Sequence, residues 1–315
     1  MKILVFHQPY PMGNYKLNQV IAEYFEKEGH EVYLLEQLNG RPANEDYIQQ
    51  ILNLDLDLCY YEMLDIMTFK IVERLKCQKI LLQASGGVLG GYNKIIDFKG
   101  KWYDKILTNS LIMEEKFKQN NIPTQHFKFY HSAISEDEKQ IKPEYNHDCV
   151  FLGMGFNRLT DPQYDLEREL YFHEKDFDFN VYGNGWNGFK HWRGLLPPND
   201  IGSLYSSAKC AIGIIAKGQR EHGMINNRYT EIASCGCPLI SYNYDTIDWF
   251  GADKFIHFIK NKQELKDIVL DINNNPEKYK SNSNNFKLFM EKQTQEFYSN
   301  LENLIQRNLN LWRKV

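Results

Sequence analysis

The chain has 315 residues, of which 43% are hydrophobic and 25% are charged, with a formal net charge of −4. This composition is ordinary for a globular protein and excludes a disordered or fibrous chain, and the length fits two domains better than one. The weak negative charge gives no overall attraction to nucleic acid or to an anionic membrane, although contact with a membrane surface through a local patch stays open.

No window approaches the roughly 18 apolar residues of a membrane-spanning helix. The apolar run that starts at Ile3 is too short for a signal peptide. The six cysteines are scattered, with neither a Cys-x-x-Cys motif nor a zinc-like spacing to histidine. We therefore expect a cytoplasmic protein whose cysteines are buried free thiols.

In the first half, short apolar runs alternate with segments whose apolar residues recur at helical spacing. Strands are expected at 2–6, 31–35, 56–61, 79–83, 105–108 and 126–130, and helices at 17–27, 43–52, 63–76 and 111–119. This alternation predicts an α/β fold with a parallel, doubly wound, Rossmann-like sheet.

A polar segment that contains Pro143, residues 133–147, interrupts the pattern and is expected to link two domains. The alternation then resumes, with strands expected at 149–152, 179–182, 210–215, 238–242 and 255–259, and helices at 161–173, 199–208, 226–235 and 262–272. The Asn-rich stretch 273–285 is expected to be a loop, followed by a long amphipathic helix. The predicted organisation is a domain of residues 1–140, a second domain of residues 146–285 and a terminal helix of residues 286–315.

Residues 226–238 are the most informative stretch, because they are typical of a helix that ends at Gly236 and is followed at once by an apolar strand. Arg228 and Glu231 are three residues apart and so share one face of this helix. A cation and a carboxylate at the end of an α/β unit suit a ligand that has both a diphosphate and a sugar diol. An ordinary surface salt bridge is the alternative interpretation.

Other candidate ligand contacts follow the expected strands, where doubly wound domains bind their ligands. In the second domain they are glycines that leave room for a phosphate, cations that supply charge, and one aromatic residue: Gly153, Gly155, Arg158, Gly183, Trp186, Lys217 and Arg220. Trp186 is a candidate wall for a nucleotide pocket, with a position in the core as the alternative. In the first domain, His7 follows the first strand and is a candidate general base. The glycine-rich loop 83–92 lacks the Gly-x-Gly-x-x-Gly dinucleotide pattern, which disfavours NAD.

Five segments of the second half together resemble, in order and spacing, the donor domain of GT-B glycosyltransferases, especially the CgeB-like group. They are VFLG at 150–153, VYGNGW at 181–186, HWRGL at 191–195, LYSSA at 204–208 and NRYTEIASCGCPLI at 227–240. The resemblance implies two Rossmann-like domains with a cleft between them, and a terminal helix that crosses back onto the first domain. It also implies transfer of a hexose or deoxyhexose from a UDP or GDP sugar to a hydroxyl of a glycan or glycoconjugate. Asn227, Arg228 and Glu231 would contact this donor, with Glu231 on the ribose hydroxyls and Arg228 near the diphosphate.

Many retaining GT-B enzymes carry two glutamates with seven residues between them, but Gly223 occupies the first of these places when counted back from Glu231. This departure favours an inverting displacement, which needs a general base and stabilisation of the departing diphosphate. His7 and Arg228 are the candidate catalytic residues. No Asp-x-Asp follows a donor-side strand, so we expect neither a metal nor a tightly bound cofactor.

Three other interpretations stay open. The chain would fit a nucleotide-sugar 2-epimerase of the same fold, which needs no acceptor, or a non-catalytic protein that binds a nucleotide sugar. It would also fit a DNA-base glucosyltransferase, which needs a basic groove on the first domain. The lysines at 99–105 and 116–118 are too ordinary to predict such a groove, so nucleic acid is not expected as a partner.

Overall fold

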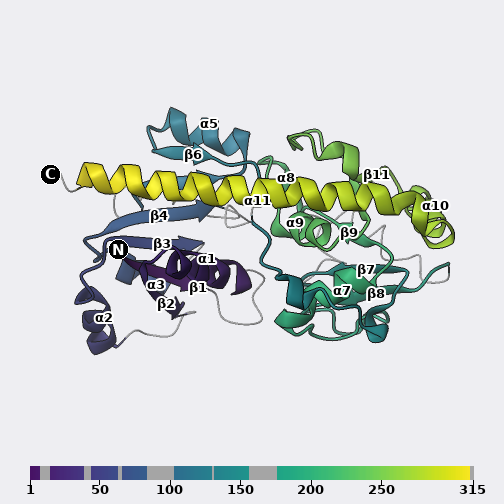
Figure 1. The fold of residues 1–315 in the computed structure, drawn as a ribbon, viewed down its shortest axis with the longest axis horizontal. Coiled ribbons are helices and arrows are strands. Elements are labelled where there is room, and N and C mark those ends of the chain that lie inside the picture. Colours follow the sequence, from purple (N-terminus) through teal and green to yellow (C-terminus); the bar gives the residue numbers. More distant parts are fainter. Residues whose placement is uncertain are drawn as a thin grey trace. The chain divides into compact units, whose positions relative to one another are not determined.

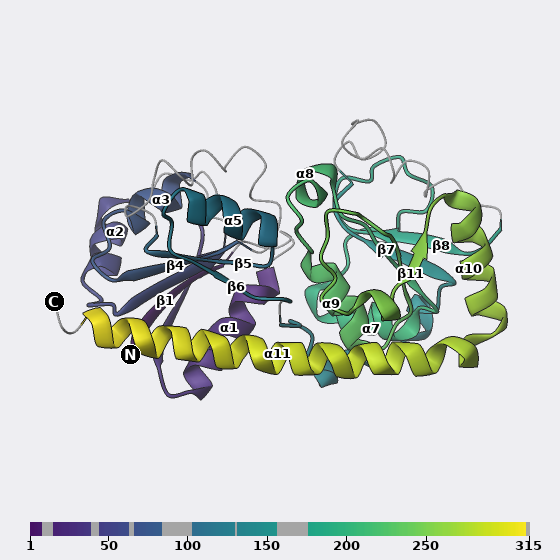
Figure 2. The ribbon, with the colours of Figure 1, turned by 90° about the horizontal axis from the view of Figure 1, so that it is seen from above.

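Figures 1 and 2 show the fold of the protein, a computed structural model that describes residues 1–7, 15–38, 44–62, 66–83, 103–129, 131–155 and 176–312. The chain divides into two compact units. Unit 1 comprises Met1–Phe127 and Tyr298–Val315, and unit 2 comprises Lys128–Phe297. Each unit contains its own parallel β-sheet, so the α/β fold class predicted from the sequence is confirmed.

Unit 1 has a six-stranded parallel sheet in the order β2-β1-β3-β4-β5-β6. Its strands are β1 (Lys2–His7), β2 (Glu31–Glu36), β3 (Leu58–Glu62), β4 (Gln78–Gln83), β5 (Lys105–Thr108) and β6 (Thr124–His126). The described helices among them are α1 (Tyr15–Lys27), α2 (Glu45–Leu52), α3 (Ile66–Val72) and α5 (Leu111–Gln119). Because β3 joins β1 on the side opposite β2, the strand order reverses between β1 and β3.

The central strands of unit 1 are apolar because helices cover both faces of the sheet. Figure 2 shows α1 on one face and α2, α3 and α5 on the other. Residues 3–6 of β1 and all five residues of β3 are buried, whereas the edge strand β2 has exposed residues at both ends and between them. The apolar runs in the sequence therefore mark the middle of the sheet, and the more polar run marks its edge.

Unit 2 has a five-stranded parallel sheet in the order β11-β10-β9-β7-β8. Its strands are β7 (Cys149–Leu152), β8 (Phe179–Tyr182), β9 (Ala211–Gly213), β10 (Leu239–Tyr242) and β11 (His257–Ile259), with helices α7 (Ile201–Ser207), α8 (Lys217–Arg220), α9 (Asn227–Ser234) and α10 (Lys262–Asn274). The order reverses between β7 and β9, as it does between β1 and β3 in unit 1. The helix expected at 161–173 lies outside the described residues.

The segment 133–147, expected to be an interdomain linker, instead packs as part of unit 2. Ile134 and Tyr145 are buried in its core. Lys142 donates to Asp200 at 2.6 Å and Tyr145 donates to the same carboxylate at 2.7 Å. The segment is polar, as the sequence shows, but its polar side chains find their partner in Asp200, about 55 residues further along the chain. The boundary between the two units falls earlier, after Phe127.

The last helix, α11 (Pro276–Trp312), begins ten residues before its expected start, so most of the Asn-rich stretch expected to be a loop is helical. Packing explains the difference, because Tyr279, Ser283 and Phe286 are buried and the Phe286 ring stacks on Phe255 at 5.3 Å. Tertiary contacts override the weak helix propensity of asparagine. From Tyr298 onward α11 belongs to unit 1, where the Tyr298 ring stacks on Tyr24 of α1 at 4.1 Å.

All six cysteines are free thiols and five of them are buried, as predicted. Burial is the main cause that raises the pKa of the Cys149 and Cys237 thiols well above the ordinary value, so both stay protonated and act as packing groups. Among the helices of the described residues, none has the length and apolar character needed to cross a bilayer.

Candidate functional site

The carboxyl ends of β7 and β9 mark the point in unit 2 where the strand order reverses, and doubly wound sheets bind ligands at such a point. Gly153 follows β7 and Gly183 follows β8. The N–H of Gly153 donates to the carbonyl of Tyr182 at 3.0 Å, and a Cβ atom on residue 183 would lie 2.1 Å from the carbonyl oxygen of Gly153. Glycine at 183 is therefore required for the close approach of the two loops, and its φ of +124° adds a second reason.

The same two loops are held together further out. The N–H of Gly155 donates to the carbonyl of Asn184 at 2.7 Å, and a Cβ atom on residue 155 would lie 2.3 Å from a backbone oxygen of the second loop. The indole N–H of Trp186 donates to the carbonyl of Gly153 at 2.7 Å, and its ring packs edge-on against Phe151. Only 2% of Trp186 is exposed, so its ring supports the loops from within the core, the alternative that the sequence left open.

Arg228 fastens the ends of β7 and β9. Its Nε donates to the carbonyl of Leu152 at 2.6 Å, and its Nη1 donates to the carbonyl of Ile214 at 3.0 Å. Its guanidinium carbon lies 4.7 Å from the centre of the Phe151 ring, in the range of a cation–π contact. A guanidinium has five N–H donors, so these two bonds leave donors for a further acceptor. Arg228 thus holds a positive charge at the point where the strand order reverses.

The start of α9 adds further donors to this edge of the sheet. Asn226 precedes the helix, donates through Nδ2 to the carbonyl of Ile214 at 3.1 Å and makes no side-chain cap bond. Asn226 is only 6% exposed, and its buried Oδ1 has no hydrogen-bond partner in the described structure. Helix N-termini carry uncompensated N–H groups and partial positive charge, which suits an anion. The helix ends as predicted, with Gly236 at a φ of +67°.

Glu231 lies one helix turn further along α9 and is 9% exposed. The side-chain amide of Asn227 donates to its Oε1 at 2.8 Å. Arg228, three residues before Glu231, directs its guanidinium to the strand ends instead. A surface salt bridge, the alternative interpretation of the Arg-x-x-Glu spacing, therefore does not describe this arrangement.

Lys217 and Arg220 lie on α8, between β9 and α9 in the chain. The Nζ of Lys217 is 3.9 Å from a carboxylate oxygen of Glu221, and both side chains are about half exposed. The guanidinium carbon of Arg220 lies 5.8 Å from the centre of the Tyr244 ring. Both cations thus lie on the short helix that precedes α9 in the chain, and their contact with a diphosphate stays a prediction.

One protein-family model matches part of the chain. Residues 165–295, which all lie in unit 2, match a family model described as "Glycosyl transferase-like". This match covers less than half of the chain. No curated protein matches this chain.

Among solved structures, an alpha-glucosyltransferase in complex with UDP and a 13-mer DNA matches with a TM-score of 0.66 at 12% identity, covering 97% of this chain and 100% of the other. T4 phage BGT in complex with UDP-glucose matches at 0.65 and 13% identity, with 97% and 99% covered. Anabaena Alr3699/HepE in complex with UDP and glucose matches at 0.60 and 12% identity, with 96% and 100% covered. The chain has the GT-B fold. At these identities the likeness concerns the fold, and it confirms the GT-B resemblance found in the sequence.

In this GT-B chain, unit 1 has a reversal point of its own between β1 and β3. His7, the predicted general base, is the last residue of β1 and is half-buried. Its backbone carbonyl accepts from the N–H of Gln37 at 2.9 Å. Arg158 and the glycine-rich loop after Gln83 lie outside the described residues, so the structure adds nothing to their predicted roles.

No group of three or more His, Cys, Asp or Glu side chains is placed to hold a metal ion in the parts of this GT-B chain that the structure describes. The donors at the candidate site are the backbone N–H groups of α9 and the Arg228 guanidinium. These groups suit an anion better than a cation.

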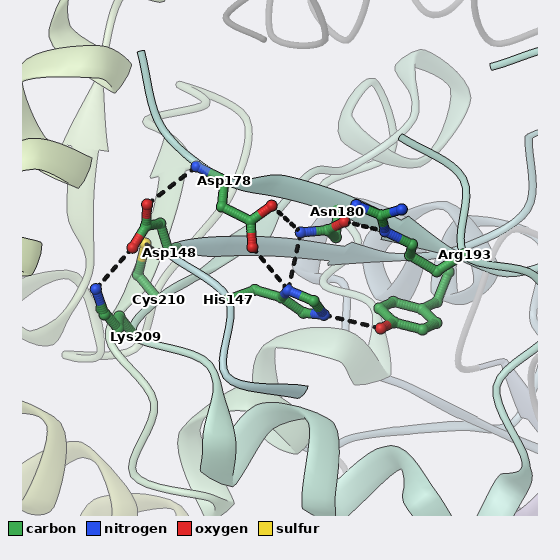
Figure 3. Close-up of polar contacts among 8 residues, drawn as sticks. His147, Asp148, Asp178, Asn180, Arg193, Lys209 and Cys210 are labelled. Carbon is green, nitrogen blue, oxygen red and sulfur yellow. Dashed lines mark hydrogen bonds and ion pairs between the residues drawn. The ribbon is translucent and has the colours of Figure 1, made fainter. Parts of the chain in front are cut away.

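A second polar cluster, not found from the sequence, lies at the amino ends of β7 and β8 (Figure 3). The Nδ1 of His147 lies 2.9 Å from Oδ2 of Asp178 and 2.9 Å from Nδ2 of Asn180, and its Nε2 lies 2.9 Å from the hydroxyl of Tyr182. Arg193 donates to Oδ1 of Asn180. These amino ends lie at the edge of the unit 2 sheet opposite the carboxyl ends of the strands, where the candidate site is.

The cluster has a clear electrostatic consequence. Burial tends to raise the pKa of the Asp178 carboxyl, but hydrogen bonds from His147 and Asn180 outweigh this effect and lower it. Nearby, Asp148 accepts from Lys209 at 2.7 Å and from the N–H of Asp178 at 3.0 Å. These partners are about 30 to 60 residues apart, so no local spacing in the sequence could have revealed them. We assign the cluster a structural role in joining the strands.

Proposed function

We propose that this protein is a glycosyltransferase that moves a hexose from a nucleoside diphosphate sugar to an acceptor hydroxyl. The observation that carries the proposal is the position of Arg228, whose guanidinium joins the ends of β7 and β9 beside the start of α9. This arrangement places a fixed positive charge and the N-terminus of α9 at the point where the strand order reverses. The glycosyl transferase-like family match over residues 165–295 supports the assignment.

For the donor we propose a uridine diphosphate sugar bound by unit 2, because the similar GT-B structures contain UDP or UDP-glucose. GDP is the alternative base. Arg228 and the start of α9 would contact the diphosphate, with Lys217 and Arg220 adding charge. Glu231 would accept from the ribose hydroxyls, with Asn227 holding one of its oxygens.

For the reaction we propose an inverting displacement that needs no metal. The bond between the anomeric carbon and the donor phosphate oxygen breaks, and the negative charge that develops on the diphosphate is stabilised by Arg228 and the N–H groups of α9. His7 takes the proton of the attacking hydroxyl, since an imidazole titrates near neutral pH.

For the acceptor we propose an uncharged hydroxyl compound such as a glycan or glycoconjugate. Unit 1, residues 1–127 and 298–315, contains 17 Lys and Arg and 17 Asp and Glu. This balance gives unit 1 no general attraction to a polyanion. DNA is the second candidate, because one GT-B structure similar to this chain was solved with a 13-mer DNA.

A nucleotide-sugar 2-epimerase and a non-catalytic nucleotide-sugar-binding protein are the remaining alternatives. The epimerase would form product from the donor alone. The binding protein would hold the donor without turnover. A cytoplasmic location and contact with a membrane surface also stay predictions.

The first test is a thermal-shift series of the purified protein with UDP, GDP, CDP, ADP and NAD, without added metal. Because a ligand that binds the folded state stabilises it, a concentration of 100 times Kd adds about 2.7 kcal/mol. We expect the largest shift with UDP. Glu231→Ala should reduce that shift strongly, whereas Glu221→Ala, which removes a half-exposed carboxylate of the neighbouring loop, should leave it unchanged.

A UDP shift that Glu231→Ala leaves intact would refute the ribose assignment. A shift with NAD alone, or with no nucleotide, would refute the transferase proposal. With the donor identified, glycan and duplex DNA acceptors are compared directly by release of the nucleoside diphosphate, with a donor-only reaction as the control for epimerisation.

A further inference from the structure

A groove runs along one edge of the unit 2 sheet. It has a volume of about 580 Å³ and lies between β11 and the helix that follows it, α10, which are side by side in Figures 1 and 2. Its lining consists of residues 256–259, which include all of β11, and one flank of α10 that carries Glu264, Asp267, Ile268 and Asp271. The groove lies within unit 2 and contains none of the residues assigned to the donor site.

The groove exposes the edge of β11 and not one of its faces. Successive residues of a strand project to opposite faces of a sheet, so a groove that four consecutive residues line runs along the strand edge. Both faces are covered by packing. On one face, the ring centroids of Phe258 and Trp249 are 5.3 Å apart. On the other, those of His257 and Tyr279 are 5.0 Å apart.

This edge of the sheet has no partner strand. β11 is paired with β10 on one side, and no strand of the described residues is paired with its other side. Such an edge presents backbone N–H and C=O groups to a further strand, and proteins often protect it with lysine or proline. The strand His257–Ile259 contains neither. Extended segments of partner proteins bind at edges of this kind, where main-chain hydrogen bonds give affinity and side chains give specificity.

The flank of α10 makes the groove negatively charged. The hydrogen bonds that Glu264 and Asp267 accept come from neutral amides, and neither carboxylate is paired with a cation in the part of unit 2 that the structure describes. Asp271 differs, because it is paired with Lys278, and hydrogen bonds from its neighbours lower the pKa of its carboxyl to about 2. Two carboxylates without a cation therefore line the groove.

The histidine of β11 adds a neutral group to the same lining. Nε2 of His257 is buried and has no hydrogen-bond partner in the described structure. Burial, helped by the charge of Lys278, lowers the pKa of His257 below its ordinary value of 6.5, so the ring is neutral at pH 7. A neutral imidazole has one nitrogen that accepts a hydrogen bond. The side chains of the groove thus suit a cationic donor better than an anion.

We propose that this groove is the docking site for an extended segment of a partner protein, which adds to β11 as a further strand and places Lys or Arg side chains against Glu264 and Asp267. Every second side chain of such a strand faces the flank of α10. The apolar stems of Lys and Arg suit Ile268, which lies beside Asp267 in the lining. Pairing of two copies of this chain through β11 is disfavoured, because it brings two acidic flanks together. The inference is independent of the proposed function.

The test titrates the full chain with a six-residue peptide that alternates Lys and Val, and with a matched peptide in which Glu replaces Lys. We expect the Lys–Val peptide to bind at least about 10-fold more tightly. This advantage should shrink as the salt concentration rises from about 50 mM to about 500 mM, because salt screens exposed charges. Amide hydrogen exchange of β11 should become slower with the peptide bound, because amides at its edge gain partners.

The variant Glu264→Gln/Asp267→Asn removes both charges and keeps the side-chain oxygens that accept the bonds of α10. We expect it to weaken binding of the Lys–Val peptide by about 10-fold. The matched control is Glu291→Gln/Glu296→Gln, which removes two exposed carboxylates of α11. They lie at least 12 residues beyond Tyr279, about 18 Å further along the helix, so binding should not change.

Three outcomes would overturn the inference. The first is no binding of the Lys–Val peptide at about 1 mM. The second is equal binding of a Lys–Pro peptide, whose prolines have no N–H to donate, because it would show attraction of charge alone. The third is self-association of the protein that slows hydrogen exchange in β11, because the edge would then be an interface between two copies of this chain.

Discussion

A Cβ atom on residue 153 would lie 2.7 Å from Nη2 of Arg228. The glycine after β7 and the arginine of α9 thus fit together, and the same Cβ would also lie 3.0 Å from the Phe151 ring. A phosphate bound beside Gly153 would therefore lie next to the Arg228 guanidinium, which is the group proposed to bind it. Two positions 75 residues apart in the chain are therefore coupled through one contact.

Gly153→Ala should displace the Arg228 guanidinium, because contacts below 3.0 Å force a shift. We expect a loss of about 1–3 kcal/mol in the free energy of unfolding, the usual effect of overpacking, together with weaker nucleotide binding. Chemical denaturation and a UDP titration measure the two effects. If the clash with Arg228 is the cause, the loss in Gly153→Ala/Arg228→Ala is smaller than the sum of the single losses. Additive losses would contradict this coupling.

Arg228→Ala should also destabilise unit 2 by itself. It removes the bonds to the carbonyls of Leu152 and Ile214, and a hydrogen bond to a charged group contributes about 1.5–3 kcal/mol. The carbonyl of Ile214 keeps its bond from Asn226, so we expect a total loss near the value for one bond. Urea denaturation of the variant checks this, and an unchanged midpoint would show that the guanidinium does not hold the strand ends.

Tyr229→Phe should be destabilising, because the buried Tyr229 hydroxyl lies 2.9 Å from the carbonyl of Gly213 and 2.5 Å from the hydroxyl of Ser241. Its removal costs about 1–3 kcal/mol if these groups lose their partner. Tyr205→Phe is the matched control. Tyr205 is equally buried, and its hydroxyl has no hydrogen-bond partner in the described structure, so its loss should be neutral or stabilising. Equal effects in the two variants, measured by thermal unfolding, would refute this account.

The cluster of Figure 3 predicts a specific response to acid. Because the pKa of Asp178 is lowered in the folded state from its ordinary value of 3.8, its contribution to stability is fully present above about pH 3.8. The contribution is lost as the pH falls through the folded-state value. Urea unfolding of the wild type at pH 6 and pH 3 should therefore show a larger loss than unfolding of Asp178→Asn. An identical pH dependence in the two proteins would contradict the assignment.

Removal of residues 298–315 should destabilise unit 1. Leu301, Leu304 and Ile305 of this segment are buried, and full burial of one such side chain contributes roughly 1.5–3 kcal/mol. Amide hydrogen exchange of the truncated chain should become faster in β1 and α1, while β7 and β9 stay protected. Unchanged exchange in unit 1 would show that the end of α11 does not support it.

The sequence by itself determined the fold class, because apolar runs of strand length alternate with helical spacing twice along the chain. It also located the helix at Asn227–Ser234 and its glycine stop, since capping and periodicity are local properties. Expectations that depend on distant partners were less accurate. The segment 133–147 is polar yet packs as part of unit 2. The Asn-rich stretch forms the first turns of α11, because Tyr279 within it and Phe286 just after it are buried.

Only the tertiary structure decided what the individual side chains do. The sequence placed Arg228 and Glu231 on one helix face, but it is the folding of β7 and β9 next to each other that gives Arg228 two carbonyl partners. For Trp186 the sequence left a pocket wall and a core position open, and it lies in the core because the loop after β8 folds back on Gly153. Periodicity records which face of an element is apolar, whereas hydrogen-bond partners and burial arise from contacts between residues far apart in the chain.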